Sequence, residues 1–295
     1  MKSFKEKLMS GKFVHTTEIG PPKGVDFSSV LTELECVKFL VDAVNVTDQQ
    51  SAVMRLGSIA SSRVLIDNGF EPICQVTTRD RNRIALQSDL LSAFILGVRN
   101  IMIMTGDHPI LGDHPSAKPV YDLDAITLLS AIKVLESGFD LAGKKLNASP
   151  SFLVGGVVNP GADPLEPEII KMEKKIENGA MFFQTQSIFE LGKFEKFINS
   201  IKHFRSLIKI LGGIVPLRSA KMARYMNDNI PGVSIPENII TRIDKALNIE
   251  EESVLIASEI MREIKGMCDG IHFMPIRSNH LVAKILDIAG VRKGE

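Results

Sequence analysis

Two acidic side chains directly follow apolar, strand-like runs and are the first candidates for catalysis. Glu18 lies near the end of the run 13–19, before a Gly-Pro-Pro turn, and Asp107 follows the run 101–104 after a Thr-Gly pair. A carboxyl group held among apolar and rigid residues can keep its proton near neutral pH and act as a general acid. The simpler alternatives are an exposed loop glutamate for Glu18 and a common Gly-Asp turn for Asp107.

Amide and hydroxyl side chains close several other runs. Thr47 and Gln75 belong to the second and third runs, and Gln184 and Gln186 alternate along the sixth. An amide offers a donor and an acceptor together, which suits the edge of a fused heterocycle such as a pterin. Capping of the next helix is a weaker explanation for the glutamines, because Ser187 already serves that purpose.

Three further groups are weighed against plainer explanations. His108, Asp113 and His114 have the spacing of metal ligands, but each histidine precedes a proline, so a polar surface loop is favoured. Glu168 and Lys175 are seven residues apart on one helix face, and the residues alone favour a solvated face. No spacing suggests a Ser-His-Asp or Cys-His arrangement, so nucleophilic hydrolysis has no support.

The runs that carry these residues define the architecture. Helix-like stretches separate most of them, and most run starts lie about thirty residues apart, the length of one βαβ unit. The eight runs are 13–19, 43–48, 72–77, 101–107, 152–159, 181–186, 208–216 and 270–275. Polar groups gathered at the ends of eight parallel strands predict a single (β/α)₈ barrel domain over residues 1–295, with the active site on that rim.

Local signals place the helices between the strands. Asp26 is expected to cap a helix that continues to residue 39, and Asp122 is expected to cap one that ends at Gly138. Another helix is expected over about 52–67. A doubly wound open sheet is the alternative architecture, but neither G-x-G-x-x-G nor G-x-x-x-x-G-K-[ST] occurs in the chain.

Composition excludes several classes of partner. The chain has 35 basic and 35 acidic residues, so no global charge attracts nucleic acid or an anionic membrane. No apolar stretch has the length of a membrane span, and the start lacks a signal-peptide core. The three cysteines are far apart and odd in number. They support no disulfide framework and favour a cytoplasmic protein.

Taken together, these segments resemble the methylenetetrahydrofolate reductase family over essentially the whole chain. No single motif is decisive, and it is their order on successive strand ends that makes the combination specific. The matching segments are 17–22, 46–48, 75–82, 105–107, 175–180, 184–186, 213–216 and 270–273.

The resemblance implies an oxidoreductase of one-carbon metabolism and methionine biosynthesis. It would reduce 5,10-methylenetetrahydrofolate to 5-methyltetrahydrofolate by hydride transfer from a reduced flavin. By resemblance, Glu18 is the proton donor that opens the methylene bridge, Asp107 contacts flavin and folate, and Gln186 binds the pterin. The implied cofactor contacts are Thr47, Gln75, Thr105, Gly106, Asp107, Asn159, Glu168 and Lys175. This changes the interpretation of Glu168 and Lys175 from a solvated face to a cofactor clamp.

The chain departs from the well-studied bacterial members, which have His in place of Gln75 and Arg in place of Thr105. FAD is the expected flavin, with FMN as the alternative. The electron donor is NADH, NADPH or a partner electron-transfer subunit, and an oligomer or hetero-complex is expected. No metal site is expected.

Three alternatives to an autonomous reductase stay open. One is a flavin- and folate-binding subunit active only with an electron-transferring partner. Another is a flavin-free, pterin-binding barrel methyltransferase that passes the methyl group to a corrinoid. The most distant is a metal-dependent barrel hydrolase or aldolase, which requires the loop of His108 and His114 to hold a metal.

Overall fold

Eight parallel strands close into a barrel in the computed structural model, which describes residues 2–290. Each strand pairs with its neighbours in the chain, and β1 pairs with β8 to close the ring. The strands are β1 Val14–Ile19, β2 Ala43–Val46, β3 Pro72–Thr77, β4 Asn100–Met104, β5 Leu153–Val158, β6 Phe182–Ser187, β7 Lys209–Ile214 and β8 Gly270–Phe273. Each overlaps one predicted run, so the predicted (β/α)₈ barrel is confirmed.

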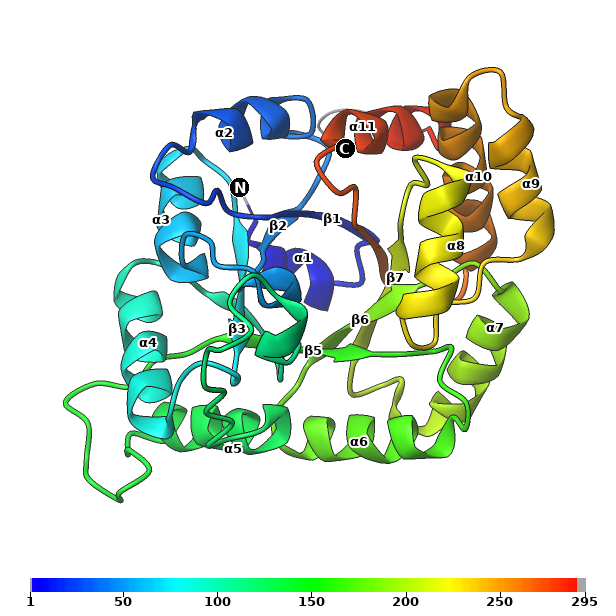
Figure 1. Cartoon of the computed structure of the whole chain (residues 1–295). Helices are drawn as coiled ribbons and strands as arrows, with labels where there is room; N and C mark the ends of the chain where they lie inside the picture. The colour runs from blue at the N-terminus through cyan, green and yellow to red at the C-terminus, as the bar shows by residue number, and fades with distance from the viewer. Residues whose placement is uncertain (1, 291–295) are drawn as a thin grey trace.

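Helices surround the strands, as the view along the barrel in Figure 1 shows. The α-helices are α1 Phe4–Met9, α2 Ser28–Glu35, α3 Ser58–Asp67, α4 Arg83–Ile95, α5 Ala125–Glu136, α6 Glu166–Glu177, α7 Leu191–Ser200, α8 Ala220–Asn229, α9 Glu237–Lys245, α10 Ile249–Ile264 and α11 Asn279–Ile288. Three short 3₁₀ turns complete the described elements: η1 Gln50–Ala52, η2 Pro109–Leu111 and η3 Lys202–Phe204.

Alternation along each strand sends every second side chain into the barrel, where the side chains form layers. The lowest layer is apolar and consists of Val14, Ala43, Ile73, Met102, Leu153, Phe182 and Leu211. The layer above it carries the polar side chains Thr16, Asn45, Gln184 and His272, which hydrogen-bond to one another. The carboxyl-end layer includes Glu18, Thr47, Thr77 and Gln186. The interior of the barrel is therefore apolar at the end covered by the lowest layer and becomes more polar toward the carboxyl-end rim.

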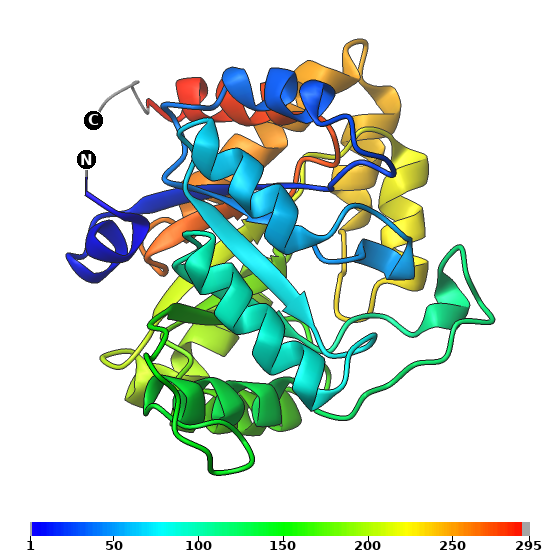
Figure 2. The ribbon, with the colours of Figure 1, turned by 90° about the vertical axis from the view of Figure 1, so that its left-hand side faces the viewer.

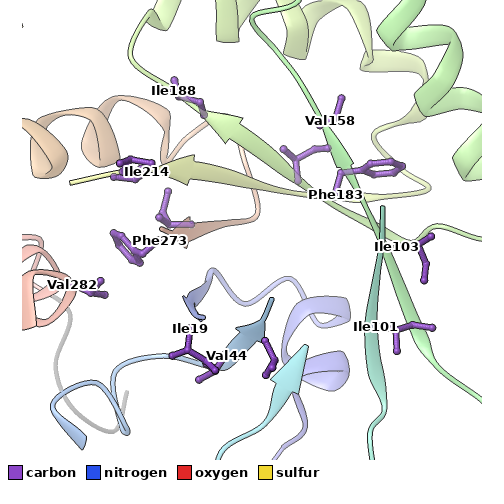
Figure 3. Close-up of a cluster of buried hydrophobic side chains, with 14 of the residues drawn as sticks. Ile19, Val44, Ile101, Ile103, Val158, Phe183, Ile188, Ile214, Phe273 and Val282 are labelled. Carbon is purple, nitrogen blue, oxygen red and sulfur yellow. The ribbon is translucent and has the colours of Figure 1, made fainter. Parts of the chain in front are cut away.

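The opposite side chains of the strands pack against the helices. This outer core combines Val, Ile, Leu and Phe from the strands with the inner faces of the helices. Figure 3 labels part of it, including Ile101, Ile103 and Phe183 from the strands and Val282 from α11. The strands are thus covered on both faces, which explains why they read as near-continuous apolar runs.

The short helix α1 closes the floor of the barrel and was not predicted from the sequence. Ser3 and Glu6 form a capping box at its start, and Phe4 and Leu8 are fully buried against the lowest interior layer. The ring of Phe4 meets the ring of Phe182 edge-on at 5.8 Å between centroids. Figure 2 shows α1 at one end of the barrel and the loop between β4 and α5 at the other. Access to the interior is therefore from the carboxyl-end rim.

Two predicted N-cap positions were wrong by one or two residues. Asp124, not Asp122, caps α5, because the capping box forms between Asp124 and Thr127. Asp122 instead binds the side chain and backbone of Arg83 and so ties the start of α4 to this loop. Asp26 accepts a hydrogen bond from the backbone of Ser28, and the helix itself begins at Ser28.

The helix expected from residue 52 begins later, at Ser58. Residues 50–52 form η1 instead, with positive φ angles at Ser51 and Ala52. Such angles cannot continue a right-handed α-helix. The segment therefore crosses the rim as a separate turn before α3 starts.

His15 gives the fold a sensitivity to acid. It faces away from the barrel axis on β1, is 8% exposed, and burial lowers its pKa from 6.5 to about 4, opposed by the nearby Asp42. Between these values only the unfolded chain takes up the proton, so stability falls as the pH drops from about 6.5 to about 4, by about 3 kcal/mol in total.

We expect His15→Phe, which keeps an aromatic ring beside Phe13, to remove this part of the acid sensitivity. Urea unfolding at pH 7 and pH 4.5 measures it, with His280→Gln as the control because His280 is largely exposed. Equal losses of stability in the wild type and in His15→Phe over this interval would contradict the assignment.

Candidate active site at the carboxyl end of the barrel

A cavity of about 620 Å³ opens at the carboxyl ends of the strands. Every residue proposed from the sequence lines it: Glu18, Thr47, Gln75, Thr105, Gly106, Asp107, Asn159, Glu168, Lys175 and Gln186. These residues come from β1 to β6 and from the segments that follow these strands, so the closed topology alone explains why they meet. The volume lies within the range of small-molecule and cofactor sites.

Glu18 projects into this cavity next to a histidine. Its side chain is 12% exposed, and its Oε2 lies 3.7 Å from Nε2 of His272. His272 comes from β8, and its own side chain is 4% exposed. A nearly buried carboxyl with one polar neighbour and open access to a cavity is suited to proton transfer to a bound ligand.

Asp107 lies on the exposed rim, and a buried arginine fixes its backbone. Arg79 is 2% exposed, pairs with Asp80, and donates from Nη1 to the backbone oxygen of Asp107 at 3.1 Å. Gly106 has φ +86°, and a Cβ there would lie 3.1 Å from Thr77 and 3.2 Å from Arg79. The tight turn therefore requires glycine at position 106. The position of Asp107 is set through its backbone, which binds Arg79.

Asp48 performs a structural task at the rim. Its Oδ2 accepts hydrogen bonds from the backbone nitrogen and the hydroxyl of Thr77, and it also pairs with Arg81. These contacts hold the ends of β2 and β3 together. One oxygen of the carboxylate is thus used by the fold, although Asp48 also lines the cavity.

Glu168 and Lys175 both bind the backbone of the β5 end. Glu168 Oε1 accepts from the Asn159 nitrogen at 3.0 Å, and Lys175 Nζ donates to the Val157 oxygen at 2.7 Å. Lys175 is 8% exposed; burial lowers its pKa and the charge of Glu168 opposes that shift. No carboxylate of residues 2–290 forms an ion pair with it. The solvated helix face that the residues alone favoured is therefore wrong for Lys175, which is a buried cation on the cavity wall.

Asn159 and Gln186 differ in how much of each side chain is left for a ligand. The Asn159 amide donates to the Pro231 oxygen at 3.0 Å and accepts from the Gly161 nitrogen, so it connects the end of β5 to the segment between α8 and α9. Gln186 uses only its carbonyl oxygen, which accepts from the Ser187 nitrogen at 3.0 Å. Its amide nitrogen has no hydrogen-bond partner within residues 2–290, and Gln186 lines the cavity.

The loop of His108, Asp113 and His114 has a structural explanation. Asp113 pairs with Lys23 at 2.5 Å and accepts from the Met54 nitrogen, and the Lys23 contact lowers the pKa of Asp113. These bonds fasten the loop against the segment after η1 and against the segment between β1 and α2. Within residues 2–290, no group of three or more His, Cys, Asp or Glu side chains is arranged to hold a metal ion.

No helix within residues 2–290 combines the length and apolar character needed to cross a bilayer.

His272 lines the cavity beside Glu18, and no role was predicted for it from the sequence. The segment 270–273 belonged to the family resemblance, but only the closure of β8 onto β1 brings His272 to Glu18. The alternation of side chains along β8 is the signal that could have predicted its position. His272 lies on the same face as Gly270 and Met274, and Met274 also lines the cavity.

The closed parallel barrel, with acids and amides gathered at its carboxyl rim around a cavity, defines an enzyme-type TIM-barrel protein. The family model described as methylenetetrahydrofolate reductase matches residues 3–290. The chain belongs to the methylenetetrahydrofolate reductase family, and the resemblance predicted from the sequence is confirmed.

Individual relatives agree with this assignment. Methylenetetrahydrofolate reductase 2 of Schizosaccharomyces pombe is 26% identical over 97% of this chain, but the match spans only 47% of that protein. The 5,10-methylenetetrahydrofolate reductase of Salmonella typhimurium is 24% identical over 77% of this chain and 72% of its own length.

A solved structure shares the fold. It is an uncharacterized protein from Clostridium thermocellum that binds two copies of 5-methyl-5,6,7,8-tetrahydrofolic acid. It has a TM-score of 0.68 and 18% identity, over 98% of this chain and 99% of that one.

Proposed function

We propose that the chain reduces 5,10-methylenetetrahydrofolate to 5-methyltetrahydrofolate, with Glu18 as the proton donor and a bound flavin as the source of hydride. The observation that carries the proposal is the nearly buried Glu18 carboxyl, which faces the same cavity as Asp107 and Gln186. Family membership supports the reaction. The Clostridium thermocellum barrel, which binds the expected product, supports the ability of this fold to accept a folate.

The cavity wall has features that fit a flavin. The Thr47 hydroxyl is buried and has no hydrogen-bond partner, although Thr47 lines the cavity. A buried polar group without a partner is costly, and a ligand amide or carbonyl would satisfy it. Gly106 allows a flat ring to approach the backbone closely. Lys175, as a buried cation without a carboxylate partner, is suited to the ribityl or phosphate part of FAD or FMN.

The proposed reaction assigns one proton step to the chain. Glu18 donates its proton to N10 of the folate, the bond between the methylene carbon and N10 breaks, and an iminium forms at N5. When bound, a reduced flavin would supply the hydride needed to convert the methylene carbon into a methyl group. Asp107, which lines the same cavity, would stabilise the cationic iminium by its negative charge. The Gln186 amide would hold the pterin ring in place.

The source of electrons is a separate part of the proposal. NADH, NADPH and a partner electron-transfer subunit are the three candidate donors, and an oligomer or hetero-complex is expected. The three cysteines form no disulfide, which supports a reducing compartment such as the cytoplasm. Turnover with an artificial reductant but with neither nicotinamide would favour the partner subunit.

We expect the purified chain to be yellow, with FAD or FMN released on denaturation. After anaerobic reduction with dithionite, addition of 5,10-methylenetetrahydrofolate should restore the oxidised flavin spectrum and produce an equivalent amount of 5-methyltetrahydrofolate. Absorbance and chromatography measure the two quantities. A colourless chain that takes up no flavin but binds 5-methyltetrahydrofolate would contradict the proposal and favour the methyltransferase alternative.

A further inference from the structure

A polar chain runs through the interior of the barrel directly beneath Glu18. It consists of Asn45, Gln184, Thr16 and His272, which come from four different strands and are all buried. A polar layer inside a barrel core is costly unless every member is hydrogen-bonded. The hydrogen bonds along this chain connect the interior of the barrel to His272, whose Nε2 lies 3.7 Å from Glu18 Oε2.

The chain starts with a reciprocal pair of amides. Asn45 Nδ2 donates to Gln184 Oε1 at 2.6 Å, and Gln184 Nε2 donates to Asn45 Oδ1 at 3.0 Å. The second hydrogen of Gln184 Nε2 is directed to the Thr16 hydroxyl oxygen at 3.3 Å. Thr16 therefore acts as an acceptor toward Gln184, and its own hydrogen is left for another partner.

Two acceptors are within reach of the Thr16 hydroxyl. Its oxygen lies 3.0 Å from His272 Nδ1 and 3.5 Å from the Ile271 carbonyl oxygen. We expect the Thr16 hydrogen to lie on the shorter contact, with Nδ1 as its acceptor. A neutral imidazole that accepts at Nδ1 carries its hydrogen on Nε2. Nε2 is the ring nitrogen that lies 3.7 Å from Glu18 Oε2.

We propose that His272 is the positioning residue of Glu18: the interior chain fixes it as the Nε2–H tautomer, and this N–H is presented to the Glu18 carboxyl. The donor orients the carboxyl toward the cavity and stabilises the carboxylate that remains after the proton has left. His272 itself carries no proton to the substrate. The consequence for catalysis rests on the proposed proton-donor role of Glu18, whereas the tautomer does not.

The tautomer is tested without substrate or turnover. ¹⁵N NMR of protein labelled at histidine distinguishes protonated from unprotonated ring nitrogens, and the signals missing in His272→Gln assign His272. We expect a protonated Nε2 and an unprotonated Nδ1. Glu18→Gln should shift the Nε2 signal. A hydrogen on Nδ1, or an Nε2 chemical shift that is the same in the wild type and in Glu18→Gln, would overturn the inference.

Two neighbouring threonines on β1 provide a matched pair of variants. Thr16→Val removes the hydroxyl that binds His272, and Thr17→Val removes an equally buried hydroxyl that donates to Asn279 Oδ1 at 2.6 Å on the other face of the strand. We expect Thr16→Val to give a mixture of the two His272 tautomers and Thr17→Val to leave the spectrum of His272 unchanged. Equal effects of both variants would indicate a merely structural role and would overturn the inference.

Kinetics give the catalytic readout. Removing the N–H that faces the Glu18 carboxyl at 3.7 Å should lower kcat by about 10- to 100-fold in His272→Leu, with KM changed less than about threefold. His272→Gln keeps an N–H donor and should recover most of the rate. A wild type with the expected tautomer but no folate reduction would refute the proposed function alone, whereas an active His272→Leu with unchanged kcat would refute the positioning role alone.

Discussion

Replacing Glu18 with glutamine is expected to lower the rate of methylenetetrahydrofolate reduction by about 100- to 10,000-fold, the usual contribution of a general acid. Glutamine has nearly the same shape and still occupies the cavity wall beside His272. It has no acidic proton to give, so the bond to N10 would have to break without protonation. The change removes the proposed proton donor while the rest of the cavity stays in place.

The experiment separates the two half-reactions. Stopped-flow absorbance should show normal reduction of the Glu18→Gln protein by dithionite or an artificial dye, followed by very slow reoxidation on addition of the folate. Glu35→Gln, a change on an exposed helix position, is the control and should behave as the wild type. Folate turnover at the wild-type rate in Glu18→Gln would refute the assignment of Glu18.

The strands and the rim residues were predictable because their signals are local. A β-strand alternates along its own length, and a polar residue followed by Gly or Pro marks the strand end regardless of distant neighbours. Glu18 precedes such a Gly-Pro turn, and Thr47 and Gln186 are polar residues at the ends of apolar runs, so all three could be assigned to one rim before the closure of the barrel was known. The closed topology then brings them to one cavity.

The features that were missed depend on contacts between distant parts of the chain. Helix α1 is only six residues long, and its burial depends on the floor of a barrel that later strands build. The pairing of His272 with Glu18 depends on the register of β8 against β1. The Asn159 amide binds Pro231, which lies 72 residues further along the chain. No periodicity within a short window carries this information.

The errors at the helix starts have a different cause. Asp122 and Asp124 are both suitable cap residues two positions apart, and sequence preference alone does not separate them. Thr127 decides the competition, because it completes a capping box with Asp124. Asp122 is then available for Arg83. The displaced residue thus serves the fold through a tertiary contact that only the folded chain reveals.

The largest loss of stability is expected from Phe182→Ala, at about 3–5 kcal/mol. Phe182 is fully buried in the lowest interior layer and contacts the ring of Phe4. Its ring also occupies the space above Gly155, where a Cβ would lie 2.4 Å from the nearest ring atom. Removing the ring leaves a cavity inside a closed barrel, which the surrounding strands cannot collapse to fill. Urea unfolding should show a lower midpoint, and Phe139→Ala, at a 44% exposed position, should cost less than about 1 kcal/mol.

The packing of Phe182 against Gly155 can be tested independently by a double-mutant cycle. Gly155→Ala alone should destabilise by about 1–3 kcal/mol, because the added methyl group overlaps the Phe182 ring. In the Phe182→Ala background the same methyl group enters the vacated space, so its cost should fall and the two changes should couple by about 0.5–3 kcal/mol. Strictly additive effects would mean that the ring does not fill the space above Gly155. The barrel floor, and with it the docking of Phe4 and α1, would then need another explanation.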